Sequence, residues 1–138
     1  MNRKGLTLTE VMMTVVLIAI LASAALPQYQ RTLQRGYWRT AQDLLMTIYA
    51  GEQVYFVIED AYFGPLAAGG PWATIYMDDP NGMGTVPVTF TVTAAGSGPS
   101  ATFTATATGS TGTCAGRTLT IDQTRTLNDA GWPAPGDC

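Results

Sequence analysis

Hydrophobic residues fill the stretch from Leu8 to Leu26 almost without interruption, and Glu10 is the one charged side chain within it. The apolar run from Leu6 to Leu26 covers about 21 residues, or about 31 Å as a helix, which is enough to cross the hydrocarbon core of a membrane. A carboxylate opposes the insertion of such a helix, so it is kept where a partner compensates its charge. We expect an amine to be the partner of Glu10.

An amphipathic pattern continues the helix beyond Pro27. Apolar residues recur every three or four positions with polar residues between them, which predicts a helix with one buried face. Because proline lacks an N–H and crowds the carbonyl four residues back, we expect Pro27 to kink or locally melt the helix. The prediction is one bent helix from about Leu6 to about Ile58, with an apolar face formed by Leu33, Tyr37, Ala41, Leu44, Leu45, Ile48, Glu52 and Tyr55.

The periodicity ends in residues 61–85, where Gly, Pro and Asp dominate. A loop of about 25 residues is long for a compact domain, and such loops are usually functional or partly disordered. Asp78, Asp79 and Asn81 carry oxygen atoms of the kind that bind calcium. The same residues, with Pro80 and Gly82, favour a turn that needs no metal. We predict the turn, and a calcium site is the alternative.

Apolar residues alternate with threonine over residues 86–94 and 101–108, which predicts two strands joined by a reversal at Gly96–Pro99. Residues 117–122 should add a third strand and residues 124–127 a short fourth. The apolar face of this sheet would pack on the helix between Leu33 and Tyr55. The predicted fold class is therefore α+β, a long bent N-terminal helix packed on a small antiparallel sheet of three to four strands.

Composition argues against an enzyme and against a nucleic-acid-binding protein. The 138 residues include no histidine, only 12 % are charged, and no catalytic constellation, metal site or cofactor site is predicted. Without Arg3 and Lys4 the chain has five basic and ten acidic side chains, and a net charge of about minus five disfavours nucleic-acid binding. Arg31, Arg35 and Arg39 form a local basic row at helical spacing.

The first residues, MNRKGLTLTEVMMTVVLIAILASAALP, resemble the N-terminus of a type IV prepilin. A short basic leader ends at Gly5, the apolar Leu6 follows, and Glu10 is fifth in the chain that cleavage after Gly5 would leave. The resemblance implies that a prepilin peptidase cuts after Gly5 and methylates the amine of Leu6. It also implies that Glu10 is the carboxylate used in assembly and that Pro27 bends the helix.

The resemblance implies an organisation and a function as well. Residues 1–5 would be the leader, 6–27 the transmembrane and filament-core helix, and 28–138 a globular domain with an amphipathic helix (28–58), a connecting loop (61–85), a sheet (86–127) and a C-terminal region (114–138). The chain would polymerise with other copies of itself from the inner membrane into a surface pilus, through an assembly platform and its ATPase. Adhesion, motility and DNA uptake are the roles of such filaments.

Two cysteines, Cys114 and Cys138, predict a single disulfide in a chain that is exported. The bridge would close a loop of about 25 residues and contribute about 3 to 4 kcal/mol on the chain-entropy model. It resembles the disulfide-bounded C-terminal region of type IV pilins, and it favours a pilin over a type II secretion pseudopilin.

Two alternatives to a major pilin stay open. A pseudopilin or minor pilin would share the same N-terminus. An ordinary signal peptide also has a basic start, an apolar stretch and a small-residue site, for which Ala22–Ala24 would serve, and its removal would release a soluble binding domain. The pilin interpretation is favoured by Glu10, by the Gly5–Leu6 junction and by a helical pattern that continues past Pro27.

Overall fold

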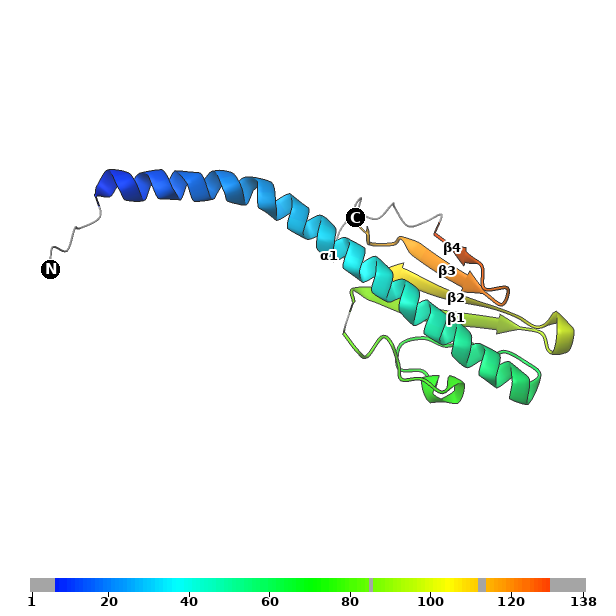
Figure 1. Ribbon diagram of the computed structural model, residues 1–138. Coiled ribbons are helices and arrows are strands. Elements are labelled where there is room, and N and C mark those ends of the chain that lie inside the picture. Colours follow the sequence, from blue (N-terminus) through cyan, green and yellow to red (C-terminus); the bar gives the residue numbers. More distant parts are fainter. Residues whose placement is uncertain (1–6, 85, 112–113, 130–138) are drawn as a thin grey trace.

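The computed structural model describes residues 7–84, 86–111 and 114–129 of the chain (Figure 1). A single sheet has the strand order β1-β2-β3-β4, and each neighbouring pair is antiparallel. The helix packs across one face of this sheet, so the predicted α+β fold is confirmed. The elements are α1 (Leu8–Glu59), η1 (Trp72–Ile75), β1 (Val88–Ala95), η2 (Gly98–Ser100), β2 (Thr102–Gly109), β3 (Thr118–Asp122) and β4 (Leu127–Asn128).

The helix α1 has 52 residues and is about 77 Å long at 1.5 Å per residue. The helix ends at Glu59, and the next residue, Asp60, caps it with a left-handed backbone (φ 54°) and an N–H that donates to the Phe56 carbonyl. Helical structure continues through Pro27, and Figure 1 shows a gentle bend between the N-terminal half and the half that lies on the sheet. The helix is therefore bent, as predicted, and it does not melt at the proline.

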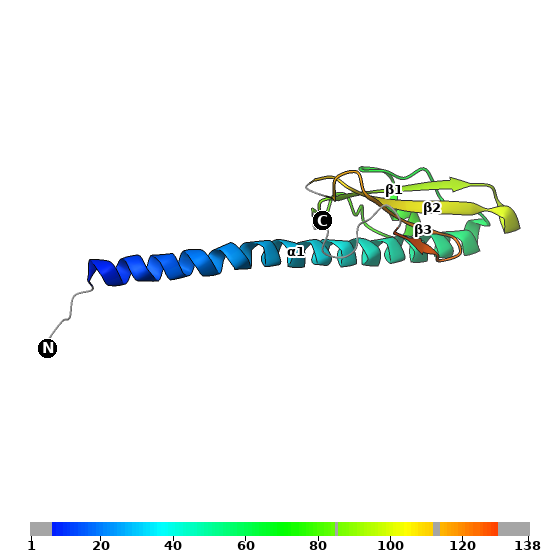
Figure 2. The same ribbon diagram turned by 90° about the horizontal axis from the view of Figure 1, so that it is seen from above.

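Only the C-terminal half of α1 has a covered face. Both views show the N-terminal half extending well beyond the sheet (Figures 1 and 2). We call residues 8–26 the stem, and the sheet with the part of α1 that packs on it the head. Packing on the head begins later than predicted, because Leu33 is 39 % exposed and the first fully buried residue of the helix is Ala41. The spacing of apolar residues predicts which face of the helix is buried, but it does not predict where along the helix the sheet begins to cover that face.

The core of the head forms where the apolar face of α1 packs on the apolar face of the sheet. Ala41, Leu45 and Ile48 follow helical spacing on α1, and all three are fully buried. Along the strands every second residue points to the helix, and the register aligns Phe90 and Leu119 on either side of Ala107. Small side chains in β2 between large ones in β1 and β3 leave room for the helix to cross the middle of the sheet.

The connection between α1 and β1 contributes to the core, which the sequence analysis did not predict. Leu66, Trp72 and Ile75 are each at most 1 % exposed. Leu66 forms an isolated antiparallel bridge with Val92 at the free edge of β1, and the Trp72 indole N–H donates to the Ala67 carbonyl at 2.8 Å. These three side chains belong to the hydrophobic core and hold the connection against the helix and the sheet.

Candidate functional site

The first turn of α1 carries a polar cap at the N-terminal end of the apolar stem. Thr7 is the N-cap residue, with an extended backbone, and its side-chain oxygen accepts a hydrogen bond from the Glu10 N–H at 3.4 Å. Thr7 and Glu10 have the spacing of a capping box, in which a threonine and a glutamate satisfy exposed backbone N–H groups at a helix start. A carboxylate in the first turn also interacts favourably with the helix dipole. Glu10 is thus locally tolerated, and its side chain is exposed.

Apolar side chains surround the stem on every side. None of the stem is buried, and an exposed apolar surface of this size requires lipid or protein to cover it. By length and composition α1 can cross a membrane, since the 19 residues of the stem span about 29 Å, close to the thickness of a hydrocarbon core. The exposed large residues of the stem are Leu8, Val11, Met12, Met13, Val15, Val16, Leu17, Ile18, Ile20, Leu21 and Leu26.

Three of the predicted site residues fall outside the described part of the chain. They are Gly5 and Leu6 of the expected cleavage site and Cys138 of the expected disulfide. Cys114 is 6 % exposed and belongs to the hydrophobic core. Its pairing with Cys138 stays a prediction, as does cleavage between Gly5 and Leu6.

The residues considered for calcium are engaged in a turn. Asp79 accepts hydrogen bonds from the Gly69 N–H at 2.7 Å and from the Asn81 N–H and side-chain amide at 2.9 and 3.0 Å. Burial alone would raise the pKa of Asp79, but these hydrogen bonds outweigh it and lower the pKa below the ordinary value. Asp78 is exposed. The structure therefore agrees with the predicted turn, and within the described residues no group of three or more His, Cys, Asp or Glu could hold a metal ion.

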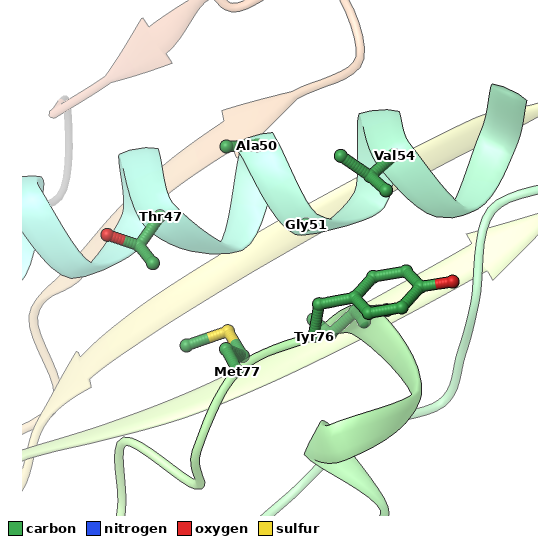
Figure 3. A pocket seen from close by; sticks show the side chains of 7 residues that line it. Thr47, Ala50, Gly51, Val54, Tyr76 and Met77 are labelled. Carbon is green, nitrogen blue, oxygen red and sulfur yellow. The ribbon is translucent and has the colours of Figure 1, made fainter.

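A groove lies where the connection passes over α1 (Figure 3). Thr47, Ala50 and Val54 line it from the helix, and Tyr76 and Met77 line it from the connection. Its volume is about 210 Å³, below the range of about 300 to 1,000 Å³ that is usual for small-molecule sites. The groove gives no support for a ligand or cofactor site.

Sequence reasoning missed the most unusual side chain of the head. The sequence analysis includes Glu52 in the apolar face of the helix, but it does not predict how the carboxyl group is accommodated there. The structure shows that Glu52 is fully buried. Its Oε2 accepts the Phe63 N–H at 2.8 Å, and its Oε1 has no hydrogen-bond partner among the described residues. The sequence does contain a signal for this burial, because Glu52 occupies a position on the apolar face of the helix.

Burial determines the protonation of this group. It raises the pKa of Glu52 to about 7, although the hydrogen bond from the Phe63 N–H acts in the opposite direction. Aromatic side chains of the connection and the helix pack close by, with the rings of Tyr55 and Phe63 5.3 Å apart and those of Phe56 and Tyr62 4.7 Å apart. The carboxyl group therefore fastens the start of the connection to α1 from inside an apolar cluster.

Residues 1–26 match the family model described as Prokaryotic N-terminal methylation motif. Together with the long apolar helix, this motif supports a type IV pilin-like protein. No curated protein and no solved structure gives a significant match to the chain. The N-terminal motif and the arrangement of a stem and a head are therefore the observations on which a functional proposal rests.

Proposed function

We propose that this protein is a structural subunit of a type IV pilus or a closely related filament. The observation that carries the proposal is the combination of a methylation motif over residues 1–26 with a stem that is apolar all around and extends from a folded head. The stem lies in the membrane before assembly and is covered by the stems of other copies afterwards. The role is structural rather than catalytic.

In the precursor, Arg3 and Lys4 lie on the cytoplasmic side, the side that the positive-inside rule favours for these two residues, and the head lies on the other side. A prepilin peptidase cuts after Gly5 and methylates the new amine of Leu6. Within the filament, Glu10 pairs with the Leu6 amine of its own or a neighbouring chain, because a carboxylate without compensation is costly in an apolar bundle. The contact is heterologous and does not close, so it propagates as a helical fibre.

The substitution Glu10→Ala tests this pairing. We expect the variant to insert into the inner membrane normally but to yield few or no fibres, because the stem keeps its apolar surface and loses its paired charge. The matched control is Glu59→Ala, which removes an exposed carboxylate at the other end of α1 and should leave fibre yield unchanged. Normal fibres from Glu10→Ala would exclude the pairing mechanism.

A pseudopilin or minor pilin is the second candidate, since its N-terminus would have the same motif. The amount of this chain in fibres sheared from the cell surface separates the candidates. A major pilin would form the bulk of the sheared protein, whereas a pseudopilin or minor pilin would be scarce there and mostly membrane-associated.

A further inference from the structure

A short polar segment of α1 lies between the stem and the head. We call residues 28–35 the collar. Gln28, Tyr29, Gln30 and Arg31 are exposed, because the collar precedes the part of the helix that the sheet covers. In both ribbon views the strands of the sheet lie beyond this segment of the helix (Figures 1 and 2). These side chains are therefore available to whatever surrounds the end of the stem.

The charge of this segment is entirely positive. No acidic residue occurs between Glu10 and Asp43, while Arg31 and Arg35 lie in the collar and Arg39 follows it by one helical turn. On the orientation proposed above, these arginines are on the exported side, close to the membrane. The positive-inside rule counts basic residues within about 15 to 20 residues of a membrane span, so they oppose the orientation that Arg3 and Lys4 favour. Arginines close to a membrane surface are attracted to anionic lipid headgroups, by about 1 kcal/mol each.

The distances along the helix place the collar at lipid headgroups. A bilayer has a hydrocarbon core of about 30 Å and a total thickness of about 40 to 45 Å, which leaves about 5 to 8 Å of headgroups on each side. With Leu26 at the edge of the hydrocarbon, Tyr29 lies about 5 Å and Arg31 about 8 Å beyond it, whereas Arg39 lies about 20 Å beyond. Tyrosine is enriched at this depth in membrane proteins, and Tyr29 is 63 % exposed.

We propose that the collar binds the phosphate groups of anionic phospholipids, through Arg31 with Tyr29 beside it, while the subunit waits in the membrane for assembly. Arg35 has an interaction of its own within the molecule, so Arg31 is the residue on which the proposal rests. The inference depends on the proposed function only in that the stem spans a membrane. If the proposal holds, Arg31 gives up its contact with lipid phosphate and gains other partners when the subunit leaves the membrane and enters a fibre.

The test uses the full-length chain reconstituted into phosphatidylcholine vesicles that contain a trace of spin-labelled lipid. Electron spin resonance gives the share of spin-labelled phosphatidylglycerol, and separately of spin-labelled phosphatidylcholine, that the protein immobilises. We expect a several-fold preference for phosphatidylglycerol that weakens as salt is raised. Arg31→Gln should reduce the preference about fivefold, in line with the known contribution of one arginine near an anionic surface.

The matched control is Arg39→Gln, which removes the same charge from the same helix about 12 Å farther from the hydrocarbon. It should change the preference little, because the interaction falls off within a Debye length of about 8 to 10 Å. Equal effects of the two substitutions, or no preference for phosphatidylglycerol, would overturn the proposal. If both variants instead lose fibre yield without any change in lipid preference, the arginines bind acids of another copy and the lipid site is excluded.

Failure of the proposed function gives a different result. Vesicle flotation of the wild-type chain comes first, and a chain that does not float with neutral vesicles lacks a membrane-spanning stem. In that case the proposed function fails as well. A chain that floats but shows no preference for phosphatidylglycerol overturns the collar proposal alone.

Discussion

Glu52 makes the stability of the head depend on pH. Its pKa in the folded chain is about 7, above the ordinary value for glutamate, so the folded state holds a proton that the unfolded state releases. Protonated Glu52 therefore stabilises the folded state fully below about pH 4, and this contribution of about 3 kcal/mol is lost as the pH rises to about 7. We expect thermal unfolding of the wild-type chain in detergent to show stability that falls from about pH 4.5 to about pH 7 and changes little above it.

The substitution Glu52→Gln should abolish this slope, because the amide does not titrate and can still accept the Phe63 N–H. Glu59→Gln is the control, since Glu59 is exposed on the last turn of the same helix, and it should keep the wild-type profile. A slope that persists in Glu52→Gln would assign the pH dependence to another group.

Two glycines of α1 should respond in opposite directions to alanine. A Cβ at Gly51 would overlap the Ile75 carbonyl oxygen, whereas a Cβ at Gly36 would meet nothing. Gly36→Ala should stabilise the chain by up to about 1 kcal/mol through helix propensity. Gly51→Ala should destabilise it by about 1 to 2 kcal/mol, because overpacking outweighs the same propensity gain. Urea unfolding of both variants measures the difference, and a stabilised Gly51→Ala would contradict the observed close approach.

The sequence could not predict these residue-scale features. From the sequence, Gly51 only lowers helix propensity. The structure shows that the backbone of the connection at Ile75 approaches it too closely for a Cβ. Glu52 fits the periodicity of the apolar face, but periodicity cannot say that a carboxylate on this face is sealed from water. Both features depend on which distant segment packs against the helix.

At the scale of elements, Asn81 fastens the connection to the edge of the sheet. Its side-chain oxygen accepts the Phe90 N–H at 2.6 Å and its amide donates to the Phe90 carbonyl at 3.1 Å, which imitates the pairing of a neighbouring strand. Asn81→Ala should leave the buried Phe90 N–H without this partner and cost about 1 to 3 kcal/mol. Hydrogen exchange at the Phe90 amide should accelerate accordingly.

Asp78→Ala is the control for this experiment, because Asp78 lies in the same connection and is exposed. It should leave the exchange rate at Phe90 unchanged. Equal protection of the Phe90 amide in wild type and Asn81→Ala would show that the side chain is not what pairs with the strand edge.

The elements with a clear period were predicted well, and the element without one was not. The helix and the strands follow from spacings of three to four and of two, and the observed β1 (Val88–Ala95) and β2 (Thr102–Gly109) lie within about a residue or two of their predicted bounds. The connection has isolated large residues among Gly and Pro, so no repeat marked Leu66, Trp72 and Ile75 as core. The last strand, β4, was predicted at 124–127 and observed at Leu127–Asn128.

At the scale of the whole molecule, the chain divides into a stem that lacks any protein cover and a head with its own core. This division could be predicted, since an apolar run before an amphipathic run is visible in the sequence and needs no tertiary information. The match of residues 1–26 to a methylation motif relates this division to the proposed function, in which the chain is cut directly before the first turn of the stem.

The intact mass and N-terminal sequence of this protein, taken from fibres sheared off its native cells, test the central claim most directly. The account predicts an abundant chain that begins at Leu6 and has an additional methyl group on its amine. A chain found free in the medium and beginning near Ala25 would contradict it, because the stem would then be a signal peptide and Glu10 would have no part in assembly.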